Sequence, residues 1–131
     1  MLVRSITTLY GENAGKVWQL VNEKNGVDEQ TLKQSTMLNK EEFHAAIGWL
    51  AREDKIKKNG DTYHLDRTNL SNDVGSVAGR VWKILDIWEE ADLQTLKKLA
   101  DISDEEAYTG LGWLAREGKI DKTDQNRYYL K

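Results

Sequence analysis

The strongest constraint on this chain is an internal repeat. The phrase GWLARE stands at residues 48–53 and again at 112–117, and KI follows one residue later in both places. With an offset of 64 residues and no gap, 20 of the 47 positions from 14 to 60 are identical to their partners. Self-similarity at a fixed spacing predicts two copies of one structural unit.

The stretch between the copies is polar and rich in turn-forming residues, which is typical of a linker. Each copy is close to the lower size limit for an independent hydrophobic core. We therefore predict a small domain at 1–66, a linker at 67–75 and a second small domain at 76–131.

Composition limits the classes of protein that remain. Hydrophobic residues make up 39% of the 131 residues, which is enough for packed cores, and cysteine is absent, which excludes disulfides and thiolate sites. No apolar run is long enough to span a membrane, and the first residues lack a signal-peptide pattern, so we expect a soluble, cytoplasmic protein. The net charge of -3 argues mildly against a nucleic-acid footprint spread over the whole surface.

Each copy contains the pattern of three helices. Apolar residues recur at helical spacing over 13–25 and its counterpart, and we place Trp18 and Trp82 in the cores. Asp28 and Asp92 are candidate N-caps of a short second helix. The third helix of each copy should begin at a capping box, NKEE at 39–42 and SDEE at 103–106, and end near Glu53 and Glu117.

A change of period follows the third helix. In KIKKNGDTYHL an Asn-Gly dipeptide separates two short segments, which is a strong signal for a tight β-hairpin. The second copy has one more residue and no glycine at this place, so its hairpin loop should be longer. Two helices, a turn, a third helix and a hairpin predict a mainly α fold with small β-hairpins (α+β), namely two tandem winged helix-turn-helix domains.

The phrase AGKVW…LGWLAREGKI resembles a small winged helix-turn-helix family of unknown function, and both copies carry it. The resemblance implies a winged-helix fold and a presumed role in nucleic-acid binding. Single-copy members of that family are thought to form dimers. A tandem chain would then be an intramolecular version of such a pair.

Gly48 and Gly112 stand inside the third helices, where a glycine costs roughly 1 kcal/mol relative to alanine. On a helical wheel Gly48 falls with His44 and Arg52 on the side opposite the apolar residues. A close neighbour at the backbone would explain both glycines. It could be a DNA backbone, a partner's helix, or close packing within the chain from the wing, a neighbouring helix or the sister copy.

Three tryptophans are candidates for an interface. Trp49 and Trp113 lie on the flank of the third helices, where each could cover the core edge, pack between the copies or stack on a base. Trp88 has a lysine as its repeat partner and would mark an asymmetric contact surface of the second copy. The interface hypothesis therefore comprises Gly48, Trp49, Trp88, Gly112 and Trp113.

A DNA-binding hypothesis depends on cations near the third helix and in the hairpin that follows it, which would form the wing. Cations that contact phosphates supply affinity but do not recognise the base sequence. Glu41 and Glu105 should point outward and repel phosphate. A solvated surface would explain the same cations. The candidates for reading base edges are His44 and Ala45, or Tyr108 and Thr109, a weaker set than arginine or asparagine would be. The candidate DNA contacts are His44, Arg52, Lys55, Lys57, Lys58, Tyr108, Thr109, Arg116, Lys119, Lys122 and Arg127.

Enzymatic function lacks support in the sequence. The two histidines, His44 and His64, both lie in the first copy and have tyrosines as counterparts, which favours an aromatic or polar-edge role over a metal site. Phosphate-binding loops, dinucleotide fingerprints and nucleophile elbows are absent. We expect no enzyme activity, no cofactor and no metal.

Two functions from different classes follow. The first is a transcription-regulator-like protein that binds double-stranded DNA with its two third helices. The alternative is a protein-interaction module that uses the faces of the third helices for a partner or for self-association, without nucleic acid. A single positive face around the third helices would favour the first function, and a buried seam between those helices would favour the second.

Overall fold

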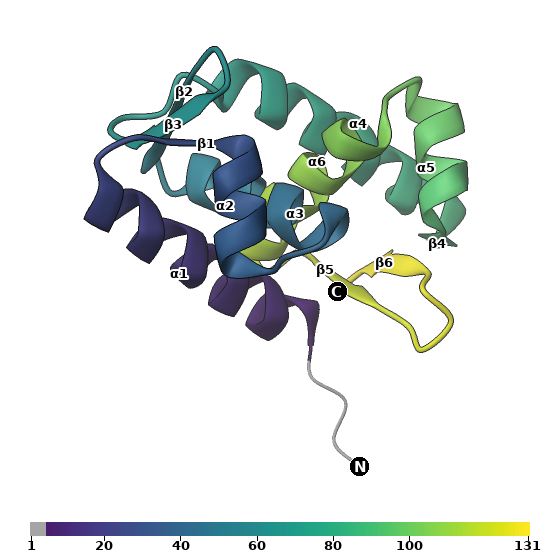
Figure 1. Ribbon diagram of the computed structural model, residues 1–131. Coiled ribbons are helices and arrows are strands. Elements are labelled where there is room, and N and C mark those ends of the chain that lie inside the picture. Colours follow the sequence, from purple (N-terminus) through teal and green to yellow (C-terminus); the bar gives the residue numbers. More distant parts are fainter. Residues whose placement is uncertain (1–4) are drawn as a thin grey trace.

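The computed structural model describes residues 5–131 and contains both predicted winged-helix units (Figure 1). The predicted fold class, mainly α with small antiparallel sheets, is confirmed. The first unit consists of α1 (Ile6–Lys24), β1 (Val27–Asp28), α2 (Glu29–Thr36), α3 (Lys40–Arg52), β2 (Ile56–Asn59) and β3 (Thr62–Leu65). The second consists of α4 (Ser71–Trp88), β4 (Glu90–Ala91), α5 (Leu93–Ala100), α6 (Asp104–Arg116), β5 (Ile120–Lys122) and β6 (Tyr128–Leu130).

The helix starts lie where the capping residues predict them. Asp28 and Asp92 cap α2 and α5 by accepting a hydrogen bond from the backbone N–H three residues on, at 2.7 and 2.9 Å. Asn39 and Ser103 each form a complete capping box at the start of α3 and α6. Such caps satisfy backbone donors that have no partner inside the helix, and so they fix where each helix begins.

Two helices begin earlier than the sequence pattern predicts. Helix α1 starts at Ile6, where Ser5 accepts a hydrogen bond from the backbone of Thr8, and not near residue 13. Helix α4 starts at Ser71, so residues 71–75 of the predicted linker are its first turns. Residues 1–4 of the predicted first domain lie outside the described part of the chain.

Each unit ends in a small antiparallel sheet with one strand more than predicted. The two residues of β1 pair with β3, and β4 pairs with β6, which gives the strand orders β1-β3-β2 and β4-β6-β5. A two-residue segment is too short to show a strand period in sequence. The first hairpin turns at Gly60, at a φ of 60°, and the second has the longer loop that its extra residue predicts.

Trp18 and Trp82 are not core residues, contrary to the prediction. They are 38% and 37% exposed, while the preceding Val17 and Val81 are completely buried. Consecutive helical residues differ by 100° in direction, so a valine at the centre of the buried stripe places the following tryptophan at its edge. The largest fully buried side chains of the two cores include Tyr63, Phe43, Leu32, Leu50, Ile56, Leu85, Leu96, Leu111 and Ile120.

The two units are clasped together through α3 and α6, which lie side by side in the middle of the molecule (Figure 1). Ile6 and Tyr10 of α1, and Ala45 of α3, belong to the hydrophobic core of the second unit. Trp49 and Trp113 pack against both cores. The linker therefore joins two units whose apolar interiors meet.

Candidate nucleic-acid and partner surfaces

The contact between α3 and α6 is centred on the two repeated glycines. A Cβ atom added to Gly48 would lie 1.9 Å from the carbonyl oxygen of Thr109, and one added to Gly112 would lie 1.9 Å from that of Ala45. These distances are far below van der Waals contact, so each helix backbone rests directly on the other. The close neighbour that the two glycines required is therefore the third helix of the sister copy, and not the wing or another helix of the same copy.

Tryptophans and ion pairs surround this contact with twofold pseudosymmetry. The guanidinium of Arg52 lies 5.7 Å from the ring centre of Trp113, and that of Arg116 lies 5.8 Å from the ring centre of Trp49. Each arginine also crosses to the other unit, because Arg52 pairs with Glu117 at 3.1 Å and Arg116 with Glu53 at 3.0 Å. We call α3, α6 and these flanking side chains the seam.

The acidic starts of α3 and α6 are engaged within the molecule. Glu41 was expected to point outward, but its carboxylate accepts hydrogen bonds from Tyr10 Oη and Lys122 Nζ, both at 3.0 Å. This prediction is wrong because the second unit covers that end of α3. Glu105 lies 3.6 Å from the ammonium of Lys40.

The candidate base-reading residues are covered to different degrees. His44 is 6% exposed and Ala45 is fully buried, so neither presents an edge to a groove in this arrangement. Burial lowers the pKa of His44, which keeps its imidazole neutral at neutral pH. Tyr108 and Thr109 of α6 are partly exposed.

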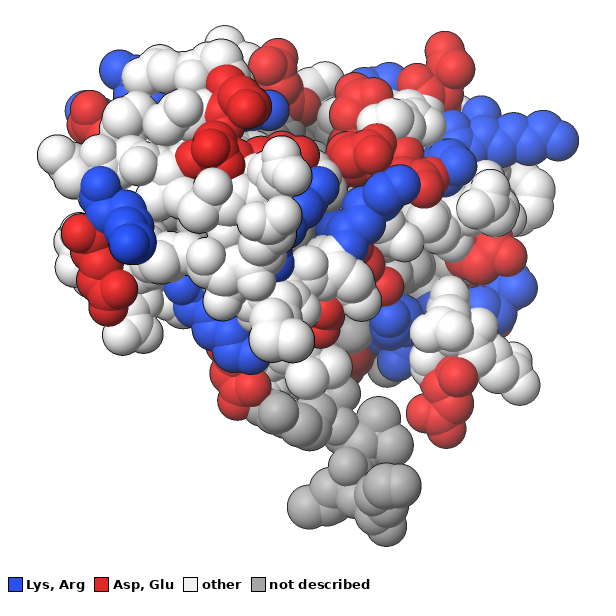
Figure 2. All heavy atoms as spheres, in the orientation of Figure 1, with Lys and Arg blue, Asp and Glu red and all other residues white. Residues whose placement is uncertain are grey.

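Most candidate phosphate-binding cations have acidic partners within the chain. Beside the two seam arginines, Lys55 pairs with Glu53, Lys119 with Glu117, and Arg127 with Glu90. Lys122 pairs with Glu41, whereas Lys57 and Lys58 have no ion pair within residues 5–131. Figure 2 shows acidic and basic groups intermingled over the face that it presents, without a continuous positive surface.

Each of the two repeats matches a known family model. The description is winged helix-turn-helix domain (DUF2582), and the matches cover residues 5–69 and 65–130. The chain belongs to this family.

One solved structure is similar to this tandem family member. It is the mRNA-binding domain of elongation factor SelB from E. coli in complex with SECIS RNA, at 13% sequence identity and a TM-score of 0.41. The alignment covers 92% of this chain and 98% of that one. No curated relative matches the sequence.

The outer surface of this winged-helix pair carries several exposed apolar side chains. Trp88 is 56% exposed and Ile87 is 76% exposed at the end of α4, beside the exposed acidic residues Asp86 and Glu89. No described helix is long and apolar enough to cross a bilayer. In the described range, no three His, Asp or Glu side chains gather as metal ligands would.

Sequence reasoning missed the part that Tyr10 of α1 plays in the contact between the two units. Tyr10 stands before the region in which the repeat is obvious, and its counterpart 64 residues later is Val74, so alignment gives no sign of its role. It is 2% exposed and reaches from α1 into the second unit. The available signal was an aromatic residue in helical spacing with Ala14 and Val17.

Proposed function

We propose that this chain is an interaction module in which two winged-helix units are clasped into one body and bind a protein partner with their outer surfaces. The main support for this proposal is the packing of α3 on α6. In a winged helix that reads duplex DNA, the third helix inserts into the major groove. Here the corresponding faces of α3 and α6 pack against each other. Insertion of either helix into a DNA groove would first require the seam to open.

Opening the seam would be costly, which supports the proposal. Separation would expose Ala45 and both glycines, break the two arginine pairs that cross between the units, and uncover the inner faces of Trp49 and Trp113. Burial of apolar surface contributes about 25 cal/mol per Å². Weak phosphate contacts from already paired cations would not offset such a loss.

The exposed end of α4 is the favoured partner surface. Ile87 and Trp88 offer a large apolar area next to carboxylates, and Trp is enriched at the energetic centres of protein interfaces. The repeat counterpart of Trp88 is Lys24, so only one unit presents this surface. The matching partner would carry an apolar patch with basic residues at its rim.

The decisive experiment measures binding to duplex DNA. Fluorescence anisotropy of a labelled 20-base-pair duplex of random sequence, at about 50 mM salt, favours any phosphate-dependent complex. We expect no change in anisotropy at micromolar protein. Binding that weakens steeply with salt, and that the Arg52→Gln and Arg116→Gln changes abolish, would refute the proposal.

The partner surface has its own test with a matched control. A photo-crosslinking amino acid at position 88 should give one specific protein adduct in the native cells. The same amino acid at Met37, which is 87% exposed, should give only background. Identical patterns from the two positions would exclude the end of α4 as the partner surface.

A second candidate function rests on Lys57 and Lys58. These two wing lysines lack an ion pair in the described range, and the fold is one that nucleic-acid-binding domains use. Binding through the first wing would leave the seam closed. In that case Lys57→Gln should weaken duplex binding and reduce its salt dependence by about one counterion, while Lys119→Gln in the other wing should have little effect.

A further inference from the structure

The first unit contains the tripeptide Lys-Asn-Gly twice, at 24–26 and at 58–60. In an Asn-Gly pair the glycine nitrogen can attack the side-chain amide carbon of the asparagine, because glycine has no Cβ atom to block the approach. The amide group leaves as ammonia, which takes up the proton of the attacking N–H, and a five-membered succinimide ring remains. Water then opens the ring at either carbonyl carbon and yields aspartate or isoaspartate. The two sites have the same local sequence, so a difference in reactivity between them comes from the fold.

The fold holds Asn25 in an unreactive geometry. Asn25 is the C-cap of α1, and its backbone N–H donates to the carbonyl oxygen of Val21 at 2.9 Å. At a φ of 53° and a ψ of 51°, its side chain lies on the opposite side of the Cα–C bond from the Gly26 nitrogen. The ring cannot close without a large rotation about that bond. The imidazole of His64 packs on Gly26 and opposes this rotation, because a Cβ atom added to Gly26 would lie 2.7 Å from its Cε1 atom.

The peptide between Asn59 and Gly60 lacks these restraints. Both residues are exposed at the tip of the first hairpin. Within residues 5–131, neither the Asn59 side chain nor the Gly60 N–H has a hydrogen-bond partner, and a Cβ atom added to Gly60 would meet nothing within 4 Å. Rotation about the Cα–C bond of Asn59 requires only that its pairing with Thr62, the last pair of the hairpin, opens. Opening at the end of a hairpin costs little free energy.

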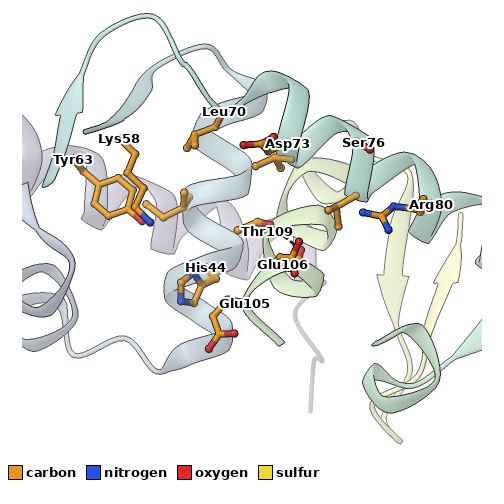
Figure 3. A pocket seen from close by; sticks show the side chains of 13 residues that line it. His44, Lys58, Tyr63, Leu70, Asp73, Ser76, Arg80, Glu105, Glu106 and Thr109 are labelled. Carbon is orange, nitrogen blue, oxygen red and sulfur yellow. Dashed lines mark hydrogen bonds between the residues drawn. The ribbon is translucent and has the colours of Figure 1, made fainter. Parts of the chain in front are cut away.

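The rest of the hairpin is anchored, so this opening stays local. The side chain of Asn69 bonds to both the backbone N–H and the carbonyl oxygen of Lys58, at 3.0 and 2.7 Å. The side chains of Lys58 and Tyr63 both line a cleft of about 390 Å³ between the two units (Figure 3). On the far side of the turn, the N–H of Glu29 donates to the carbonyl oxygen of Asp61 at 3.0 Å. Only the peptide at the start of the turn is without such an anchor.

We propose that Asn59 is a site of spontaneous deamidation in the folded protein and that the fold protects Asn25. The reaction places a new carboxylate next to Lys58, one of the two wing lysines that have no ion pair in the described range. The wing thereby becomes a poorer phosphate site. The isoaspartate product also adds a methylene group to the backbone of the turn, and the turn sets the register of the hairpin.

The test is peptide mapping by mass spectrometry after incubation of the folded protein in mildly alkaline buffer. Deamidation raises the mass of a peptide, and the aspartate and isoaspartate products separate by chromatography. We expect Asn59 to react at least about 10-fold faster than Asn25, because reaction at Asn25 must first break the hydrogen bond to Val21 and displace the His64 ring. Equal rates at the two sites, or faster reaction at Asn25, overturn the proposal.

The unfolded chain and one variant are the controls. In concentrated urea the two tripeptides should react at rates within about 2-fold of each other, because the fold no longer distinguishes them. Asn59→Ser should abolish the modification of its peptide while the hairpin still forms, since serine is accepted at the first position of a turn. An Asn59 that reacts in urea but not in the folded protein also overturns the proposal. Neither nucleic acid nor a partner at Trp88 takes part in this experiment, so its outcome is independent of the function proposed above.

Discussion

Replacement of Gly48 by alanine should destabilise the whole protein, although alanine is the better helix former. The added methyl carbon would lie 1.9 Å from the carbonyl oxygen of Thr109, and ordinary contact begins near 3.4 Å. The obstacle is backbone, which cannot rotate away as a side chain can. The two helices must therefore move apart, and the packing around them must loosen.

The magnitude follows from two opposing effects. Overpacking of a well-packed interface costs about 1–3 kcal/mol, and a backbone obstacle belongs at the upper end of that range. The gain from replacing glycine in a helix interior is at most about 1 kcal/mol. We expect Gly48→Ala to lower the free energy of unfolding by about 2 kcal/mol, and Gly112→Ala to do the same.

The matched control lies in α1. Gly15 is also inside a helix, but a Cβ atom added there meets nothing within 4 Å. Gly15→Ala should therefore raise the free energy of unfolding by about 0.5–1 kcal/mol. Urea unfolding followed by circular dichroism measures all three variants. If Gly48→Ala gains stability as Gly15→Ala does, the two helices are not in contact.

Three further predictions concern single side chains. Loss of the cross-unit pair in Arg116→Gln should cost about 0.5 kcal/mol, since the arginine is about half exposed, and a double-mutant cycle with Glu53→Gln should recover a coupling of that size. Asp92→Ala removes the hydrogen bond that caps α5 and should cost about 1 kcal/mol in urea unfolding, whereas Asp92→Asn should cost much less. Burial lowers the folded-state pKa of His44 below its ordinary value near 6.5. The buried neutral imidazole therefore contributes its full stabilisation above that pH, and this stabilisation is lost as the pH falls toward the folded-state pKa. The loss of stability between pH 7.5 and 5.5 should therefore be smaller in His44→Phe, and an unchanged difference would contradict this reading.

Local structure was accessible from the sequence because its signals are short-range. Capping boxes, N-cap aspartates and the turn at Gly60 each act within about four residues, and each was predicted at the correct place. The strands β1 and β4 were missed because two residues carry no period, and they exist only through pairing with a strand far along the chain.

The surfaces were harder to predict because a helical wheel describes one unit in isolation. It places His44, Gly48 and Arg52 on the face away from the first core, and they do lie there. That face is covered by the second unit, so the residues are buried or engaged in pairs with it. The repeated glycine was the one sequence signal that required a close neighbour, and sequence alone could not choose among the candidates.

The packing of α3 on α6 can be measured directly by nuclear Overhauser effects in solution. Gly48 and Thr109 lie at the centre of the contact, where an added Cβ atom would be 2.9 Å from the Cα atom of Thr109. We predict a strong cross-peak between the α-protons of these two residues, and its symmetric equivalent between Gly112 and Ala45. A spectrum with no cross-peak between residues 40–52 and 104–116 would contradict the seam and the functions inferred from it.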